Sequence, residues 1–161
     1  MKHQLQSFKC AARGIIFAIK HESHMRFHIV AAVYVAVFSL FYSFSPSQVA
    51  ILALLISSVI AAEVFNTSLE ELCNLDTDSY NLLAKNAKDL AAGAVLVLSV
   101  AAAVIGFIFF FDLEIIRGII AFFAVNPLLL FALVLSVILS VIFIALGPVG
   151  LTDIFYKHRK K

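Results

Sequence analysis

The chain has 161 residues, of which 63% are hydrophobic and 14% are charged, with a mean hydropathy of +1.04. This composition excludes an ordinary soluble domain, in which about 25% of residues are charged. The net charge of +2 is unevenly distributed, because the first 26 residues hold five Lys or Arg and the last five hold four, whereas Ser45–Gln48 holds none. Basic residues that flank apolar spans indicate cytoplasmic N- and C-termini, and they form no nucleic-acid patch, so we expect no nucleic-acid partner.

The first predicted element is an amphipathic helix that lies on the membrane surface. Apolar residues recur at helical spacing from Leu5 to Ile19, and Lys9, Arg13 and Lys20 group on the opposite side. A cationic face beside an apolar stripe is typical of a helix in the plane of the interface. The pattern leaves two alternatives open, a simple anchor to anionic lipid and a part of a functional site.

Two membrane spans follow, joined by a short uncharged turn. Met25–Phe44 has about 20 residues, which is enough to cross the hydrocarbon core. Glu22 and Arg26 near its start are spaced i,i+4, and such a pair is usually a solvated ion pair without further function. Ser45–Gln48 is the predicted turn, in which Pro46 ends the preceding helix.

The second span starts at Val49 and continues into a polar stripe along one helix face. The stripe spans about 100° of the helix and contains Glu63, Asn66, Thr67, Glu70 and Asn74. At 1.5 Å per residue Glu63 lies about 21 Å from Val49, in the inner leaflet. A carboxylate at that depth is costly unless it has a partner or faces a wet cavity. The stripe is therefore the candidate site.

The third span, Leu90–Phe111, follows a polar segment in which Asp78 or Ser79 caps the helix. Lys88 and Asp89 lie together just before the apolar residues. Carboxylates with nearby cations favour Mg²⁺ and phosphate together, because Mg²⁺ is held by a few carboxylates plus substrate phosphates. The sequence lacks the GxxxxGK[ST], GxGxxG, CxxC and HExxH motifs, which excludes the common nucleotide and zinc sites.

The C-terminal apolar stretch is predicted to contain a break. As one helix, Ile119–Leu146 would be about 42 Å long, too long for a single perpendicular crossing. Asn126-Pro127 offers a cap and a first-turn proline in the middle. We therefore expect Asp112–Val125 to be a partly interfacial segment and Pro127–Leu146 to be a fourth span. Cys10 and Cys73 both map to the cytoplasmic side, where a disulfide is not expected.

Three segments resemble the prokaryotic diacylglycerol kinase family, which includes undecaprenol kinases. They are SFKCAARGIIFAIKHESHMRFH, AAEVFNTSLEELCNLD and SYNLLAKNAKDLAAGAVL, in the family's order and between Ser7 and Gly106. The resemblance implies an all-α integral membrane protein with a surface helix, three family-like spans and, here, a fourth. It also implies a homotrimer with active sites shared between protomers, in the bacterial inner membrane. The activity it implies is phosphorylation of the hydroxyl group of a membrane lipid by ATP with Mg²⁺.

The resemblance further implies a role for each matched residue. Glu63 is the catalytic carboxylate beside the lipid hydroxyl, and Glu22 and Glu70 hold the metal that bridges the ATP phosphates. The nucleotide is assigned to Glu22, Glu70, Tyr80, Lys88 and Asp89. The lipid substrate is assigned to Arg26, Glu63 and Asn66.

The chain departs from the family pattern at several positions on the nucleotide side. Asn74 stands where Asp is usual, Asn81 replaces a common His, and Cys10 replaces a common Tyr. The fourth span has no counterpart in three-span members. We therefore expect a lipid kinase domain over residues 1–111 and an extension over residues 112–161, and a chain truncated after Asp112 is expected to keep its activity.

The alternative function is a non-catalytic membrane carrier or scaffold whose acidic stripe binds cations. A carrier would place polar groups on several spans near the midplane, which the sequence does not favour. Within the kinase hypothesis, diacylglycerol and undecaprenol both remain open as substrates. The choice depends on how the lipid tails fit between the spans, and no motif in the sequence predicts this.

Overall fold

The computed structural model describes the backbone of residues 2–75 and 82–158 and the side chains of residues 4–75 and 82–150. Every regular element in these ranges is a helix. They are α1 (Lys2–His21), α2 (Ser23–Phe38), η1 (Ser39–Phe41), α3 (Pro46–Asn74), α4 (Leu82–Phe110), α5 (Leu113–Val125) and α6 (Pro127–His158). Four are long and apolar enough to cross a membrane: Ser23–Phe41, Pro46–Asn74, Leu82–Phe110 and Pro127–Gly150. An all-α membrane protein with four spans is thus confirmed, while the predicted caps Asp78 and Ser79 lie outside the described residues.

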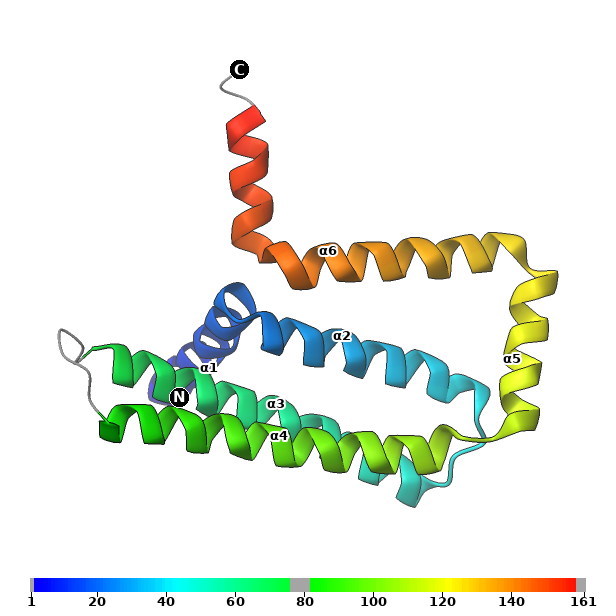
Figure 1. The fold of residues 1–161 in the computed structure, drawn as a ribbon, viewed down its shortest axis with the longest axis horizontal. Helices are drawn as coiled ribbons and strands as arrows, with labels where there is room; N and C mark the ends of the chain where they lie inside the picture. The colour runs from blue at the N-terminus through cyan, green and yellow to red at the C-terminus, as the bar shows by residue number, and fades with distance from the viewer. Residues whose placement is uncertain (1, 76–81, 159–161) are drawn as a thin grey trace.

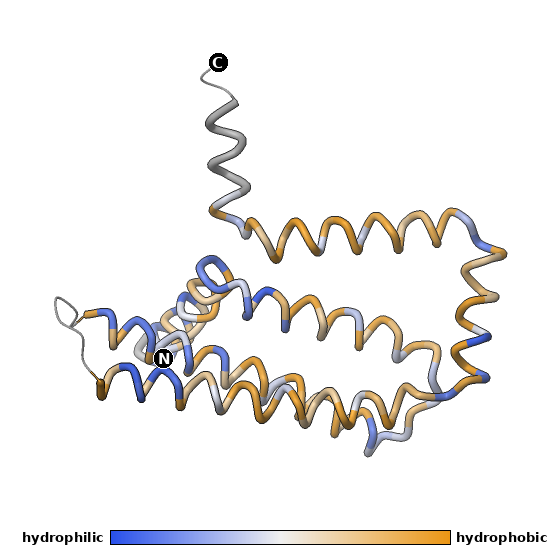
Figure 2. The backbone as a smooth tube through the Cα atoms, viewed as in Figure 1, coloured by the Kyte–Doolittle hydropathy of each residue, from blue (hydrophilic) through white to orange (hydrophobic). Residues whose placement is uncertain are grey.

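The four spans lie side by side, whereas α1 and α5 run across them at opposite ends (Figure 1). α3 and α4 form the most extensive helix pair, and α2 contacts α3 on one side and α6 on the other. Figure 2 shows apolar residues along the middle of the spans and polar residues at the end where α1 lies. Cys10 and Cys73 are both free, as predicted.

The turn between the first two spans differs from the prediction. Ser45 and Gln48 form a capping box: Gln48 N donates to Ser45 Oγ at 3.3 Å, and Ser45 N donates to Gln48 Oε1 at 2.9 Å. Pro46 is the first residue of α3, where its missing N–H leaves no helix bond unmade. The predictions that Pro46 ends the preceding helix and that the second span starts at Val49 are therefore wrong.

The predicted break at Asn126-Pro127 is confirmed, since α5 ends at Val125 and α6 begins at Pro127. Asn126 serves both helices. Its Nδ2 donates to the Phe122 carbonyl at 2.7 Å at the end of α5, and its carbonyl accepts from Leu130 N at 3.0 Å in the first turn of α6. The Asn126 side chain therefore binds the end of α5, and the prediction that it caps α6 is wrong. α5 lies across the span ends, as expected for an interfacial segment (Figure 1).

Aromatic side chains and one cap fix the end of the molecule that carries α5. The Tyr42 hydroxyl donates to the Phe110 carbonyl at 2.7 Å, and the Phe44 and Phe110 rings meet edge to face with centroids 5.1 Å apart. Asp112 then accepts from two backbone N–H groups in the first turn of α5, at 2.9 and 3.1 Å. These contacts tie the α2–α3 turn to the end of α4.

The order of the spans predicts which positions share a membrane face. Single cysteines at Ser47→Cys and Glu114→Cys should react with an impermeant maleimide from one side of sealed vesicles, and Lys9→Cys from the other, because each crossing reverses the chain. The background would carry Cys10→Ser and Cys73→Ser. Labelling of the Ser47 and Lys9 positions from the same side would contradict the four crossings.

Candidate functional site

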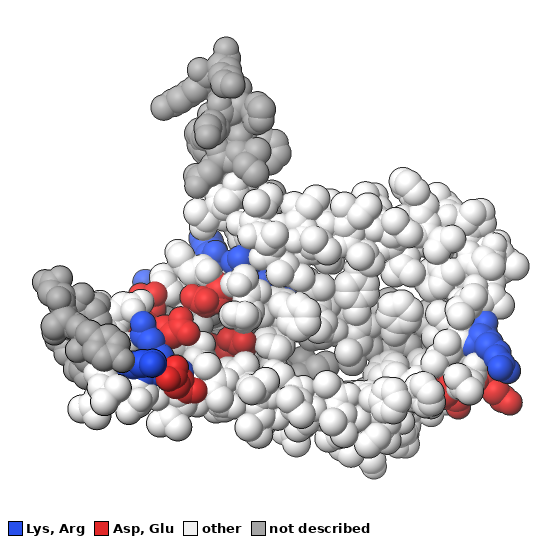
Figure 3. Space-filling view, viewed as in Figure 1, with Lys and Arg blue, Asp and Glu red and all other residues white. Residues whose placement is uncertain are grey.

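Charged side chains gather at the end of the molecule where α1, the start of α2, the end of α3 and the start of α4 meet (Figure 3). A smaller charged group lies at the opposite end beside α5, and the visible surface between the two is uncharged. The larger group contains the polar stripe that was predicted on α3. Its members come from helices that are separated in sequence. The fold therefore adds charged residues of other helices to the stripe on α3.

Glu63 is the most buried carboxylate of this group, with a side chain only 4% exposed. Its Oε1 lies 3.2 Å from Nε2 of His28 on α2. A carboxylate can only accept, so Nε2 carries the proton when this contact is a hydrogen bond to ionised Glu63. The costly carboxylate at membrane depth therefore has its partner on a neighbouring span.

Asn66 and Glu70 continue the stripe along α3 toward its polar end. Asn66 Nδ2 donates to Glu70 Oε1 at 3.1 Å, which fixes the orientation of the amide because the carboxylate cannot donate. Asn66 Oδ1 is then left as the free acceptor; it is buried and has no hydrogen-bond partner within the described part of the chain. An unpaired buried acceptor is costly, so this oxygen marks a place for a donor or a cation.

Glu22 lies at the corner between α1 and α2. It occupies the N-cap position of α2 with an extended backbone, yet its side chain makes no capping hydrogen bond. Glu22, Glu70 and His24 all interact electrostatically with Glu63. The structure therefore brings together the three carboxylates that were predicted from two separate parts of the sequence.

Glu22, Glu70 and Asn66 carry the hard oxygen atoms that Mg²⁺ prefers, and Asn66 and Glu70 are in contact with each other. Among the residues that the structure describes, no three His, Cys, Asp or Glu side chains are placed to hold a metal by themselves. Mg²⁺ rarely needs such a cage, because it usually keeps several waters and binds one or two carboxylates together with substrate phosphates. The unpaired Asn66 Oδ1 beside Glu70 supplies a further hard oxygen of the required type.

The predicted nucleotide residues are only partly assembled. Lys88 Nζ donates to Asn74 Oδ1 at 2.7 Å, a contact that joins the start of α4 to the end of α3. Asp89 is exposed on the next position of α4. Tyr80 and Asn81 lie outside the described residues, and the role of Tyr80 remains a prediction.

Arg26 does not pair with Glu22, and the interpretation of these residues as a solvated ion pair is wrong. Its side chain is only 5% exposed, and its guanidinium donates to backbone carbonyls of α1 and α6. A contact between Arg26 and the lipid substrate remains a prediction.

His28 was not among the predicted site residues, although the sequence held a signal for it. It lies at membrane depth in an apolar span, one helical turn after His24, and ionisable residues in spans usually face a partner or a pathway. What the sequence lacks is the contact between α2 and α3 that brings His28 to Glu63.

Comparisons with known proteins identify the family to which the chain is similar. Residues 9–110 match the family described as prokaryotic diacylglycerol kinase. An undecaprenol kinase of Bacillus subtilis is 38% identical over 105 residues, 65% of this chain and 85% of that protein. A diacylglycerol kinase of Synechocystis is 38% identical over 103 residues, 63% of this chain and 59% of that protein. No solved structure matches the chain. The matched range covers α2, α3 and most of α1 and α4, and it ends before α5 and α6.

Proposed function

Because this chain belongs to the prokaryotic diacylglycerol kinase family, it is a lipid kinase, and we propose that it transfers the γ-phosphoryl group of ATP to the hydroxyl group of a membrane lipid with the help of Mg²⁺. Membership in this family removes the support for a non-catalytic carrier or scaffold. The two curated relatives are named for different lipids, undecaprenol and diacylglycerol, so the proposal includes both.

The observation that carries the proposal is the buried Glu63 carboxylate, which contacts His28 of α2. Glu63 shares one face of α3 with Asn66 and Glu70. A lipid alcohol cannot leave the interface, and ATP cannot enter the hydrocarbon. A kinase that joins the two needs a proton acceptor at the depth of the lipid hydroxyl and phosphate-binding groups nearer to water. Glu63 and Glu70, two helical turns apart on α3, meet both requirements.

The proposed chemistry is one in-line transfer. A Glu63 carboxylate oxygen accepts the proton of the lipid hydroxyl, the hydroxyl oxygen forms a bond to the γ-phosphorus, and the bond from that phosphorus to its bridging oxygen breaks to release ADP. His28 Nε2 donates to Glu63 Oε1 and so holds the carboxylate in place. Mg²⁺, when bound by Glu22 and Glu70, would neutralise the phosphate charge.

We place this reaction at the cytoplasmic face of the bacterial inner membrane. The support is the basic residues of the first 26 positions, which lie at the end of the molecule that holds Glu22 and Glu70. We also propose a homotrimer with shared active sites, as the family resemblance implies. Lys85 and Asp89 are exposed on α4 beside the site, where a neighbouring protomer would complete the nucleotide contacts.

The first test is phosphate transfer from labelled ATP to diacylglycerol and to undecaprenol in mixed micelles. Glu63→Gln should lower the turnover by on the order of 10²-fold or more, because the amide cannot take the proton. Nucleotide binding and assembly should be nearly unchanged, since Gln has the same shape. Glu71→Gln, an exposed carboxylate on the same helix, is the control. Near-normal turnover by Glu63→Gln would remove Glu63 as the base.

The second test concerns the metal. Glu22→Gln and Glu70→Gln should each raise the Mg²⁺ concentration that gives half-maximal activity, because each removes a charged oxygen ligand. If both serve one ion, the double variant should lose little beyond the worse single variant. Effects that multiply would indicate separate roles.

The third test concerns His28. His28→Phe should lower the free energy of unfolding by about 1–3 kcal/mol, because it leaves the buried Glu63 carboxylate without its donor. His28→Gln keeps a donor and should lose less, and adding Glu63→Gln to His28→Phe should recover part of the loss. Unfolding midpoints in detergent would measure this for the two single variants and the double variant. Equal losses from His28→Phe in the wild type and in the Glu63→Gln background would contradict the pairing.

A further inference from the structure

One buried guanidinium joins the ends of two helices that are far apart in sequence. Arg26 Nη1 donates to the carbonyls of Ile19 at 3.1 Å and Lys20 at 3.2 Å in the last turn of α1. Its Nε and Nη2 both donate to the carbonyl of Ile144 in α6, at 3.1 and 3.0 Å. The last carbonyls of a helix lack intrahelical donors and carry partial negative charge, so a cation is well placed there.

The Ile144 carbonyl has no donor within its own helix at the usual position, because α6 is kinked just beyond it. In a continuous helix this carbonyl would accept from the backbone N–H of residue 148, but that residue is Pro148 and has no N–H. Gly147 has a φ of +63° and lies directly against Arg26. A Cβ at Gly147 would stand 2.8 Å from Cζ and Nη1 of Arg26, so glycine is required both by the backbone and by the space.

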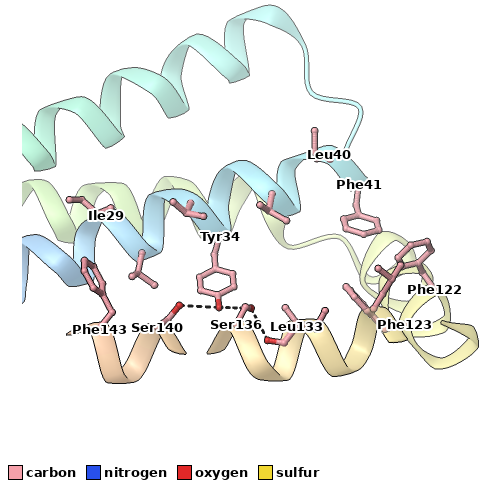
Figure 4. A pocket seen from close by; sticks show the side chains of 15 residues that line it. Ile29, Tyr34, Leu40, Phe41, Phe122, Phe123, Leu133, Ser136, Ser140 and Phe143 are labelled. Carbon is pink, nitrogen blue, oxygen red and sulfur yellow. Dashed lines mark hydrogen bonds between the residues drawn. The ribbon is translucent and has the colours of Figure 1, made fainter. Parts of the chain in front are cut away.

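A second polar contact attaches α6 to the same partner helix. The Tyr34 hydroxyl on α2 lies 3.0 Å from Ser136 Oγ and 3.3 Å from Ser140 Oγ, inside an otherwise apolar cavity of about 670 Å³ between α2, α5 and α6 (Figure 4). α6 is thus hydrogen-bonded to α2 at two heights. Rotation or sliding of α6 would break both contacts.

We propose that Arg26 is a positioning residue through which the fourth span fixes the α1–α2 corner that carries Glu22. Arg26 holds the Ile19 and Lys20 carbonyls immediately before the corner, and α6 holds Arg26. The inference rests on the proposed function, in which Glu22 is a metal ligand. It assigns α6, which lies outside the range matched to the family, a part in metal binding.

This contact reverses the expectation that truncation after Asp112 leaves the activity intact. Without α6, the Nε and Nη2 donors of a buried guanidinium would lose their acceptor, Ile144 O. These donors would then extend toward water or lipid headgroups, so Arg26 would move and release the carbonyls of α1.

The test compares two glycine variants of α6 in the full-length chain in lipid nanodiscs. Gly147→Ala forces a side chain against the guanidinium, whereas a Cβ at Gly150 meets only Leu146 Cβ, at an ordinary 3.5 Å. Gly147→Ala should raise the Mg²⁺ concentration for half-maximal transfer roughly threefold to tenfold, with a smaller change in the rate at saturating Mg²⁺. Gly150→Ala should match the wild type.

A direct readout separates metal positioning from a general loss of activity. Mn²⁺ binding, followed by EPR with a non-hydrolysable ATP analogue, should weaken in Gly147→Ala by the same factor and stay unchanged in Gly150→Ala. Equal Mn²⁺ binding by the two folded variants would overturn the proposal. A wild-type chain that transfers no phosphate to lipid would instead contradict the proposed function.

A second variant covers the case in which Gly147→Ala does not fold. Arg26→Lys keeps the charge, but a single ammonium cannot donate to both helix ends as the planar guanidinium does, so Mn²⁺ binding should again weaken. Normal Mn²⁺ binding by Arg26→Lys would overturn the proposal. Failure of both variants to assemble would overturn it too, because Arg26 would then serve folding alone.

Discussion

The contact between His28 and Glu63 is the interaction on which the site depends. In the hydrocarbon region a polar group has no water to bind, so it must find its partner inside the protein. Glu63 finds it on α2 at 3.2 Å, so the contact links α2 to α3 within the candidate site. From that pair, Asn66 and Glu70 continue along α3 toward the polar end of the molecule.

α3 is long enough for the candidate site to extend from the hydrocarbon core into water. With 29 residues the helix is about 43 Å long, which exceeds the roughly 30 Å hydrocarbon core. Glu63, Asn66 and Glu70 therefore sit on one rigid element while their surroundings change from apolar to aqueous. α4 has the same length and packs along α3, which keeps the projecting turns of α3 supported. In the proposed reaction a rigid helix would hold these groups better than a loop, because most of the catalysis of phosphoryl transfer is positioning.

The sequence predicts what depends on a single helix and misses what depends on pairs of helices. The stripe from Glu63 to Glu70 follows from helical spacing, and the break at Pro127 follows from local backbone chemistry. The pairing of His28 with Glu63 requires α2 to pack on α3, and the contact of Arg26 with Ile144 joins residues 118 positions apart. Neither has a local pattern. Pro46 is a different case, because the sequence held the signal and the interpretation missed it. Ser45 and Gln48 have the spacing of a capping box, and a proline between them suits the first position of a helix.

The same rule of satisfied polar groups explains how a span outside the family range becomes part of the structure. The guanidinium of Arg26 has five N–H donors, and the last turn of α1 supplies acceptors only for Nη1. α6 carries the complementary defect, a carbonyl at Ile144 that Pro148 leaves without its usual donor. Unpaired donors on Arg26 or an unpaired carbonyl at Ile144 would each cost free energy when buried. The hydrogen bonds between them satisfy both groups. The kink in α6 is therefore best understood as the feature that supplies the acceptor, and Gly147, the residue with positive φ beside the guanidinium, is what allows the two helices to approach closely enough for the contact to form.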